Sequence, residues 1–463
     1  MPVYGVWLSL FGLIAVGLLG SWILAAGLLM LLLRQLARPF DFLTSFLIVT
    51  VGASFIRNEG GHLTLELSLL SGLILFMLIS YVVSNPGRWL ALPRTPLLVP
   101  LLAYVGLTIA NFARGALTGL SLKFAGLELL PVMALGSSLL VANGIDPRRD
   151  LRVATVVLIA MAYGNAALGY YFFAAFHQRT GGVYFMPMPG MIAVLAVNLA
   201  LRAPRRLGAL GWILASLPLF GHQLISFTRG YWLGCLAGLL TSFVTYTRWG
   251  RGSGGRLRRA SFVSVILFAG GLAAALALGL LLGQSDLLTL AGSRFGTITA
   301  TGLTPETGAN VARLVEYATV LHHIATSPWF GHGLGFAYTF REPLGFAVVE
   351  QWYSHEIYLF VTLKQGLVGL AIFVWMVWSA AVLGIREAGR HDDVWESSWL
   401  AAAGACTVFM AVLDLSNFHF CMVNGTFPLA LLWGATMAIG RQGSVRFHWS
   451  RPEGHALPVP QVP

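Results

Sequence analysis

The stretch IYLFVTLKQGLVGLAIFVWMVWSAAVL, residues 357–383, contains a single charged residue, Lys364. A transmembrane helix needs about 20 mostly apolar residues, because the hydrocarbon core is about 30 Å thick and each helical residue rises about 1.5 Å. This stretch is therefore predicted to cross a membrane. Comparable apolar runs recur along the chain, at residues 6–33, 40–56, 65–83, 97–110, 120–142, 154–176, 183–201, 207–225, 231–246, 262–282, 399–413 and 423–439.

The composition excludes a soluble protein. Hydrophobic residues make up 57% of the 463 residues and charged residues only 10%, so there are too few polar side chains to cover a water-exposed globule. The formal net charge of +11 does not indicate nucleic-acid binding, because the basic residues lie between the apolar runs. Only three cysteines are present, which excludes a disulfide framework.

The basic residues predict how the chain is threaded through the membrane. Loops rich in arginine and lysine stay on the cytoplasmic side, and most of the basic residues fall in alternate loops. The predicted cytoplasmic loops contain Arg34, Arg38, Arg88, Arg94, Arg148, Arg149, Arg152, Arg202, Arg205, Arg206, Arg248, Arg251, Arg256, Arg258, Arg259, Arg386, Arg390, Arg441, Arg446 and Arg451. The other basic residues fall in or near the opposite loops, among them Arg114, Arg229, Arg313 and Lys364.

One loop on the outer side is much longer than the rest. Connections of this length are usually functional or disordered, and residues 311–324 have apolar side chains at helical spacing, which favours an ordered, partly helical cap. We therefore expect an all-α polytopic membrane protein with about 12–13 transmembrane helices and one large periplasmic loop. The expected parts are N-terminal spans at 1–283, the loop at 284–354, C-terminal spans at 355–440 and a disordered cytoplasmic tail at 441–463.

Three basic side chains near the predicted outer face are the main candidates for chemistry. His355 lies where the long loop re-enters the membrane, and histidine can act as a general base toward a hydroxyl group; an interfacial histidine bonded to a carbonyl explains it equally well. Arg229 begins a span, and a guanidinium suits a diphosphate, although it is also suited to binding lipid phosphate. Arg313 lies one helical turn before Glu316, so it is a candidate either for ligand binding or for an ion pair with Glu316.

Weaker candidates lie in the same outer regions. Asp414 ends a span and is suited to orienting a base or to capping the helix. The weaker candidates together are Arg179, Glu316, Arg341, Glu356 and Asp414. No HExxH or Walker A motif occurs in the sequence, and no Asp-x-Asp or paired-carboxylate motif occurs in a predicted outer loop, so we expect no metal and no cofactor.

Three segments in this order resemble the O-antigen ligase and O-antigen polymerase superfamily of bacterial envelope polysaccharide glycosyltransferases, and most of all the O-antigen ligases. They are SFTRGYWLG at 226–234, RLVEYATVLHHIATSPWFGHGLG at 313–335 and SHEIYLFVTLKQGLVGL at 354–370. In that family, an arginine before a span and another in the large loop bind the donor diphosphate, and a histidine at the end of the loop acts on the acceptor. The matching positions are Arg229, Arg313 and His355.

The resemblance implies a metal-independent, inverting glycosyltransferase of the bacterial inner membrane with its active site facing the periplasm. The donor would be a glycan on undecaprenyl diphosphate, and the acceptor the lipid A-core or another glycan. Membrane lipid is the only other partner implied, and nucleic acid is not one. A polymerase of O-antigen or exopolysaccharide and a protein O-oligosaccharyltransferase remain open alternatives. A secondary transporter is an alternative of a different class, because Lys123, Glu128 and Lys364 fall within predicted spans; Lys364 also suits a surface-lying segment before Gly366.

Overall fold

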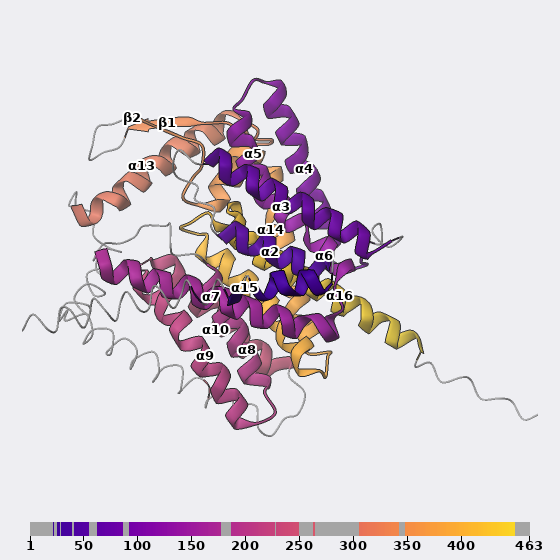
Figure 1. The fold of residues 1–463 in the computed structure, drawn as a ribbon. Helices are drawn as coiled ribbons and strands as arrows, with labels where there is room; N and C mark the ends of the chain where they lie inside the picture. The colour runs from indigo at the N-terminus through magenta and orange to yellow at the C-terminus, as the bar shows by residue number, and fades with distance from the viewer. Residues whose placement is uncertain are drawn as a thin grey trace, which may run out of the picture.

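A computed structural model describes residues 22, 26–27, 29–38, 41–54, 63–86, 92–176, 187–226, 228–249, 263, 305–341 and 348–449. In this part of the chain almost all of the regular structure is α-helical (Figure 1). The helices are α2 (Phe42–Ser54), α3 (Leu63–Ser84), α4 (Leu98–Leu117), α5 (Leu122–Gly136), α6 (Ser138–Gly144), α7 (Pro147–Phe176), α8 (Met188–Arg202), α9 (Arg206–Ile225), α10 (Arg229–Trp249), α13 (Pro305–Thr326), α14 (Ile357–Ala388), α15 (Val394–Leu413), the 3-10 helix η1 (His419–Cys421) and α16 (Val423–Trp449).

Seven described helical segments are long and apolar enough to cross a membrane, which confirms the predicted all-α polytopic membrane protein. They lie at 98–117, 122–144, 147–171, 206–224, 357–388, 394–413 and 423–441, and three shorter apolar helices lie at 42–53, 70–84 and 187–202. Each predicted run that falls mainly on described residues coincides with a helix, or with the α5 and α6 pair. The runs at 6–33 and 262–282 lie largely outside the described residues.

The exposed surface of the helices is suited to lipid. On α10, Leu233, Leu236, Leu240 and Val244 are each more than half exposed and recur at helical spacing, so they form one apolar stripe on the outside of the bundle. By contrast, the side chains of α8 are almost all buried, and most of those of α15 are too. An apolar helix surface that is exposed on one side and packed on the other is expected of a helix at the border between protein and lipid.

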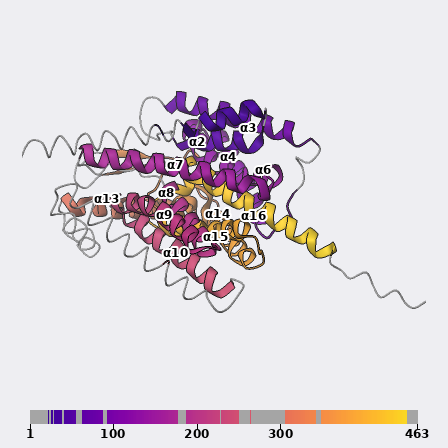
Figure 2. The same ribbon diagram turned by 60° about the horizontal axis from the view of Figure 1, so that its bottom comes forward.

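The helices are arranged with α2, α3 and α4 on one side of the molecule, α9 and α10 on the other, and α15 between them (Figures 1 and 2). The long loop forms a cap of α13 and a two-stranded antiparallel sheet, β1 (Tyr338–Arg341) and β2 (Val348–Gln351), in which Tyr338 pairs with Gln351. Both views place this cap at the opposite end of the molecule from the C-terminal end of α16. The helix in the loop was predicted, whereas the sheet was not.

Several spans begin at a side chain that accepts hydrogen bonds from the free backbone N–H groups of the first turn. Asp393 accepts bonds from the N–H groups of Trp395 and Glu396 at the start of α15. Ser121 accepts one from Phe124 at the start of α5. These caps fix where each helix begins, because the first four N–H groups have no partner within the helix. Toward the C-terminus, α16 continues to Trp449, so the start of the segment expected to be disordered at 441–463 is helical.

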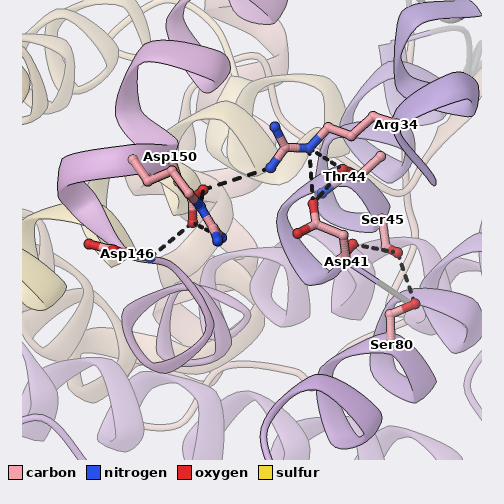
Figure 3. Close-up of polar contacts among 8 residues, drawn as sticks. Arg34, Asp41, Thr44, Ser45, Ser80, Asp146 and Asp150 are labelled. Carbon is pink, nitrogen blue, oxygen red and sulfur yellow. Dashed lines mark hydrogen bonds and ion pairs between the residues drawn. The ribbon is translucent and has the colours of Figure 1, made fainter. Parts of the chain in front are cut away.

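A cluster of charged residues joins the segment before α2 to the first turn of α7 (Figure 3). Arg34 lies 3.2 Å from a carboxylate oxygen of Asp41 and 3.8 Å from one of Asp150, and Arg149 also pairs with Asp150, at 2.7 Å. The cluster shows that two arginine-rich loops predicted for the same side of the membrane do meet in space. Arg114, from the opposite set, instead donates hydrogen bonds to the carbonyl oxygens of Phe330 and Gly331 in the cap region.

Candidate functional site

His355 is held by Glu316 across the junction between the cap and the bundle. Nδ1 of His355 lies 2.6 Å from one carboxylate oxygen of Glu316, and the backbone N–H of His355 donates to the other at 2.9 Å. The side chain of Glu316 is only 2% exposed, whereas that of His355 is 34% exposed. Since the carboxylate accepts the proton on Nδ1, Nε2 is the nitrogen left to exchange protons with a ligand.

The environment of Glu316 keeps it ionised. Burial alone raises the pKa of this carboxyl group, but the hydrogen bonds and the charge of His355 lower it by more, so the pKa lies below the ordinary value of 4.5. The hydroxyl group of Tyr338, at the start of β1, lies 3.2 Å from Glu316 Oε1 and 2.8 Å from the carbonyl oxygen of Tyr353. The unpredicted sheet therefore fixes the carboxylate that positions His355.

Arg313 is on the same face of α13 as Glu316. Residues three apart on a helix have Cβ atoms about 5–6 Å from each other, which places Arg313 next to the residue that holds His355. The ion pair with Glu316 that the sequence left open does not form, because Glu316 is bonded to His355 and Tyr338. Within the described part of the chain Arg313 is half-buried and makes no ion pair or hydrogen bond. Its guanidinium is thus not committed to a described partner.

Arg229 is the first residue of α10, and its side chain lies outside the described part of the structure. The position of its backbone is fixed by the next residue, since a Cβ atom on Gly230 would lie 2.5 Å from Asn417 Nδ2 and 2.6 Å from Ser416 Oγ. Only glycine permits this contact between the start of α10 and the 414–421 segment. In turn, the Phe418 ring in that segment lies 6.2 Å from the ring of His355. The start of α10 and His355 therefore flank the same short segment.

Asp414 and Glu356 serve the backbone around the site. Asp414 is fully buried and accepts hydrogen bonds from the N–H groups of His419 and Phe420, at 2.9 and 2.6 Å, so it shapes the 414–421 segment. Glu356 caps α14 by accepting bonds from the N–H groups of Tyr358 and Leu359. Glu316, and not Asp414, is therefore the carboxylate that orients His355. Asp414 ends α15, which is the helix-capping role that the sequence also allowed.

Of the two remaining weak candidates, Arg341 is not brought to His355. Arg341 is exposed at the far end of β1, about 10 Å along the strand from Tyr338 at about 3.3 Å per residue. Arg179 lies outside the described residues. No three His, Cys, Asp or Glu side chains among the described residues come together in a way that suits a metal ion.

Lys364 and Glu128, two of the residues that favoured a transporter, form a buried ion pair. Each side chain is 1% exposed, and Lys364 Nζ lies 2.5 Å from Glu128 Oε1. The alternative that Lys364 lies in a surface segment is therefore wrong. Lys364 also donates to the carbonyl oxygen of Phe336, and Glu128 accepts the backbone N–H of Gly335, so the pair binds the cap to α5 and α14. Lys123, the third such residue, is exposed near the start of α5.

The PWFGHGLG turn at 328–335 fits into a break in α14. Gly366 leaves the helical conformation, with φ of 69° and ψ of −172°, and this frees backbone groups inside an apolar span. The turn forms hydrogen bonds with these groups. The backbone N–H groups of His332 and Gly333 donate to the carbonyl oxygens of Leu363 and Lys364. In the other direction, the N–H groups of Leu367 and Val368 donate to the carbonyl oxygens of residues 328 and 329. A non-helical backbone at this depth is stable only where other protein groups bond to it.

Residues 214–374 match the family described as O-antigen ligase. The matched segment contains Arg229, Arg313, Glu316 and His355, as well as the turn at 328–335 and the break in α14. No curated protein matches the chain. The resemblance indicated by the three sequence segments is thereby confirmed.

Proposed function

We propose that this multi-pass membrane protein transfers a glycan from undecaprenyl diphosphate to an acceptor hydroxyl group at the periplasmic face of the inner membrane. The premise is the match of residues 214–374 to the O-antigen ligase family. The family match supports a glycosyltransferase-type enzyme; the donor, the acceptor and the side of the membrane belong to the proposal. The observation that carries it is the pairing of His355 with Glu316, one helical turn from Arg313.

His355 is the proposed general base. With Nδ1–H bonded to Glu316, Nε2 is free to remove the proton of the acceptor hydroxyl as its oxygen attacks the anomeric carbon of the donor sugar. The buried carboxylate holds the imidazole in this tautomer and stabilises the imidazolium that forms. The exposure of His355 allows the sugar to reach it.

Arg313 and Arg229 are the proposed ligands of the diphosphate. The leaving group carries away the electron pair of the glycosidic bond, so cations held near it lower the barrier. Arginine is suited to this role because its planar guanidinium donates two parallel hydrogen bonds to phosphate oxygens and stays charged. Attack opposite the diphosphate inverts the anomeric carbon in one displacement, without a covalent enzyme intermediate. In this proposal the two arginines supply the charge stabilisation and no metal ion takes part.

The acceptor decides between an O-antigen ligase, which transfers the glycan to lipid A-core, and a polymerase or a protein O-oligosaccharyltransferase. We favour the ligase because the matched family is described as O-antigen ligase. Purified protein in nanodiscs should be given the lipid-linked glycan donor with lipid A-core, a second lipid-linked glycan or an acceptor protein in turn. Transfer to lipid A-core supports the proposal. Transfer only to another acceptor overturns the ligase assignment, and uptake of substrate into vesicles without transfer overturns the enzyme.

A further inference from the structure

Four aromatic side chains that come from three separate parts of the chain form a continuous row beside His355. Phe124 lies in the first turn of α5, Trp352 and Tyr353 lie between β2 and α14, and Phe418 lies in the 414–421 segment. We call these four residues the aromatic row. Each of them is half-buried, so part of each side chain is exposed.

Neighbouring rings in the aromatic row are in contact. Phe124 stacks on Trp352 with centroids 5.8 Å apart and an interplanar angle of 12°, and Tyr353 stacks on Phe418 with centroids 4.6 Å apart and an angle of 24°. Trp352 and Tyr353 meet edge to face at 5.3 Å and join the two stacks. Such pairs hold each other's orientation, so the row is a preformed surface.

The aromatic row ends at the proposed base. The ring of His355 lies 5.3 Å from that of Tyr353 and 6.2 Å from that of Phe418. A ligand lying along the row would therefore have one end next to Nε2 of His355. The pairing of His355 with Glu316 does not need these rings, so the base and the row are separate features that meet at one point.

The chemistry of the row suits sugar rings. A pyranose has a face of C–H groups with slight positive charge, and the face of an aromatic ring is slightly negative, so the two attract and exclude water from each other. Tryptophan and tyrosine are well suited to such a partly wet surface, because each has an apolar body and a polar group at its edge. Aliphatic side chains would offer only apolar area without the oriented charge.

The position of the row favours the acceptor glycan over the donor. The start of α10, where Arg229 is the proposed diphosphate ligand, packs against Ser416 and Asn417. From Phe418 the row continues through Tyr353 and Trp352 to Phe124 on α5. In an inverting displacement the attacking hydroxyl approaches from the side opposite the diphosphate. The row contacts the base that acts on this hydroxyl, so we assign the row to the acceptor.

We propose that the aromatic row of Phe124, Trp352, Tyr353 and Phe418 is the acceptor subsite, and that it binds the sugar rings next to the hydroxyl group that His355 activates. The ligand class is an oligosaccharide, bound by its C–H faces. The inference deepens the proposed function and rests on it.

Binding of the acceptor can be measured without catalysis. Purified protein carrying His355→Gln, in nanodiscs, would be titrated with the oligosaccharide released from the lipid A-core by mild acid, and saturation-transfer NMR would report binding. Adding Trp352→Ala should weaken binding about tenfold, which corresponds to about 1.4 kcal/mol and lies within the range for an aromatic contact. Trp352→Phe should restore most of the affinity. Trp329→Ala is the matched control, since Trp329 is 64% exposed and is not part of the row.

Kinetics in the wild-type background then separate the acceptor from the donor. Trp352→Ala should raise KM for the acceptor about tenfold, with little change in kcat or in KM for the lipid-linked donor. Equal binding by Trp352→Ala and Trp329→Ala, no binding of the oligosaccharide by the protein, or an increase confined to the donor KM would each overturn the subsite. Because the binding measurement does not depend on turnover, it still gives a result if His355 is not the base.

Discussion

The carboxylate of Glu316 lies 2.6 Å from Nδ1 of His355, although 39 residues separate the two in the chain. This contact joins α13 of the cap to the start of α14, and it sets which nitrogen of His355 faces a ligand. A histidine oriented by a buried carboxylate is a common arrangement for a general base, because the carboxylate selects the tautomer and stabilises the charged form. The first predictions concern this pair.

Replacing His355 by alanine should abolish glycan transfer while leaving the protein folded. General base catalysis contributes about 10²–10⁴-fold to a rate, so the loss should reach that range. Transfer would be followed with purified donor and acceptor in nanodiscs, and folding by size-exclusion profile and Tm. His322→Ala is the matched control, because His322 is an exposed histidine on α13. Near wild-type transfer by His355→Ala would remove His355 from the mechanism.

Replacing Glu316 by glutamine should lower kcat about 10²-fold with little change in the acceptor KM. The amide keeps the size of the side chain but carries no charge to stabilise the imidazolium, and it does not select the tautomer. Glu350→Gln is the control, since Glu350 is an exposed carboxylate on β2 of the same cap. A Glu316→Gln variant with unchanged kcat would show that this contact is structural only.

The same substitution should change how stability depends on pH. The folded protein holds the pKa of Glu316 below its ordinary value of 4.5, so the unfolded chain binds more protons as the pH falls through this range. Ionised Glu316 therefore contributes stability above pH 4.5, and this contribution is lost as the pH falls through the lowered pKa. The Tm difference between the wild type and Glu316→Gln should be largest near neutral pH and should shrink as the pH falls below 4.5. A difference that grows on acidification would contradict the assignment.

Replacing Arg313 or Arg229 by lysine should lower kcat/KM for the lipid-linked donor at least about tenfold. A lysine keeps the charge but does not form the two parallel hydrogen bonds that a guanidinium makes to phosphate. Initial rates at varied donor concentration would measure the effect. Arg341→Lys should leave kcat/KM unchanged, because Arg341 is exposed at the far end of β1. Unchanged donor kinetics in both Arg313→Lys and Arg229→Lys would argue against diphosphate binding.

Removing one member of the Glu128 and Lys364 pair should be strongly destabilising. Removal of either side chain leaves the charge of the other buried in an apolar span without a partner. Such a loss lowers the free energy of unfolding by about 3–5 kcal/mol. Replacing both, as Glu128→Leu with Lys364→Met, should recover much of the loss, because no unpaired charge then remains. Tm values of the two single variants and the double variant, compared as a cycle, would test this. Additive losses would show that the two side chains do not stabilise each other.

The sequence predicted the helices well because each depends on the length and the apolar character of its own segment. An apolar run of sufficient length forms a helix in lipid whatever its neighbours are, since every backbone group must be bonded within the segment. For the same reason the run at 357–383 was recognised as a span, and apolar spacing in 311–324 predicted the helix of the cap. Arg313 and His355 stood out because ionisable side chains are rare in this chain and lie at the ends of apolar segments.

The partners of those side chains depended on contacts between distant segments. From the sequence, the partner considered for Glu316 was Arg313, and only the folding of α13 against the start of α14 showed that Glu316 binds His355. The partner of Lys364 also depended on tertiary contacts, because no other charged residue lies within two helical turns of it in α14. The aromatic row likewise could not be predicted, because its members come from three separate parts of the chain. The apolar spans and their order follow from the sequence by itself, because lipid enforces hydrogen bonding within each helix. Which side chains meet at the cap was decided by tertiary packing, because it depends on the angles and depths at which separate helices come together.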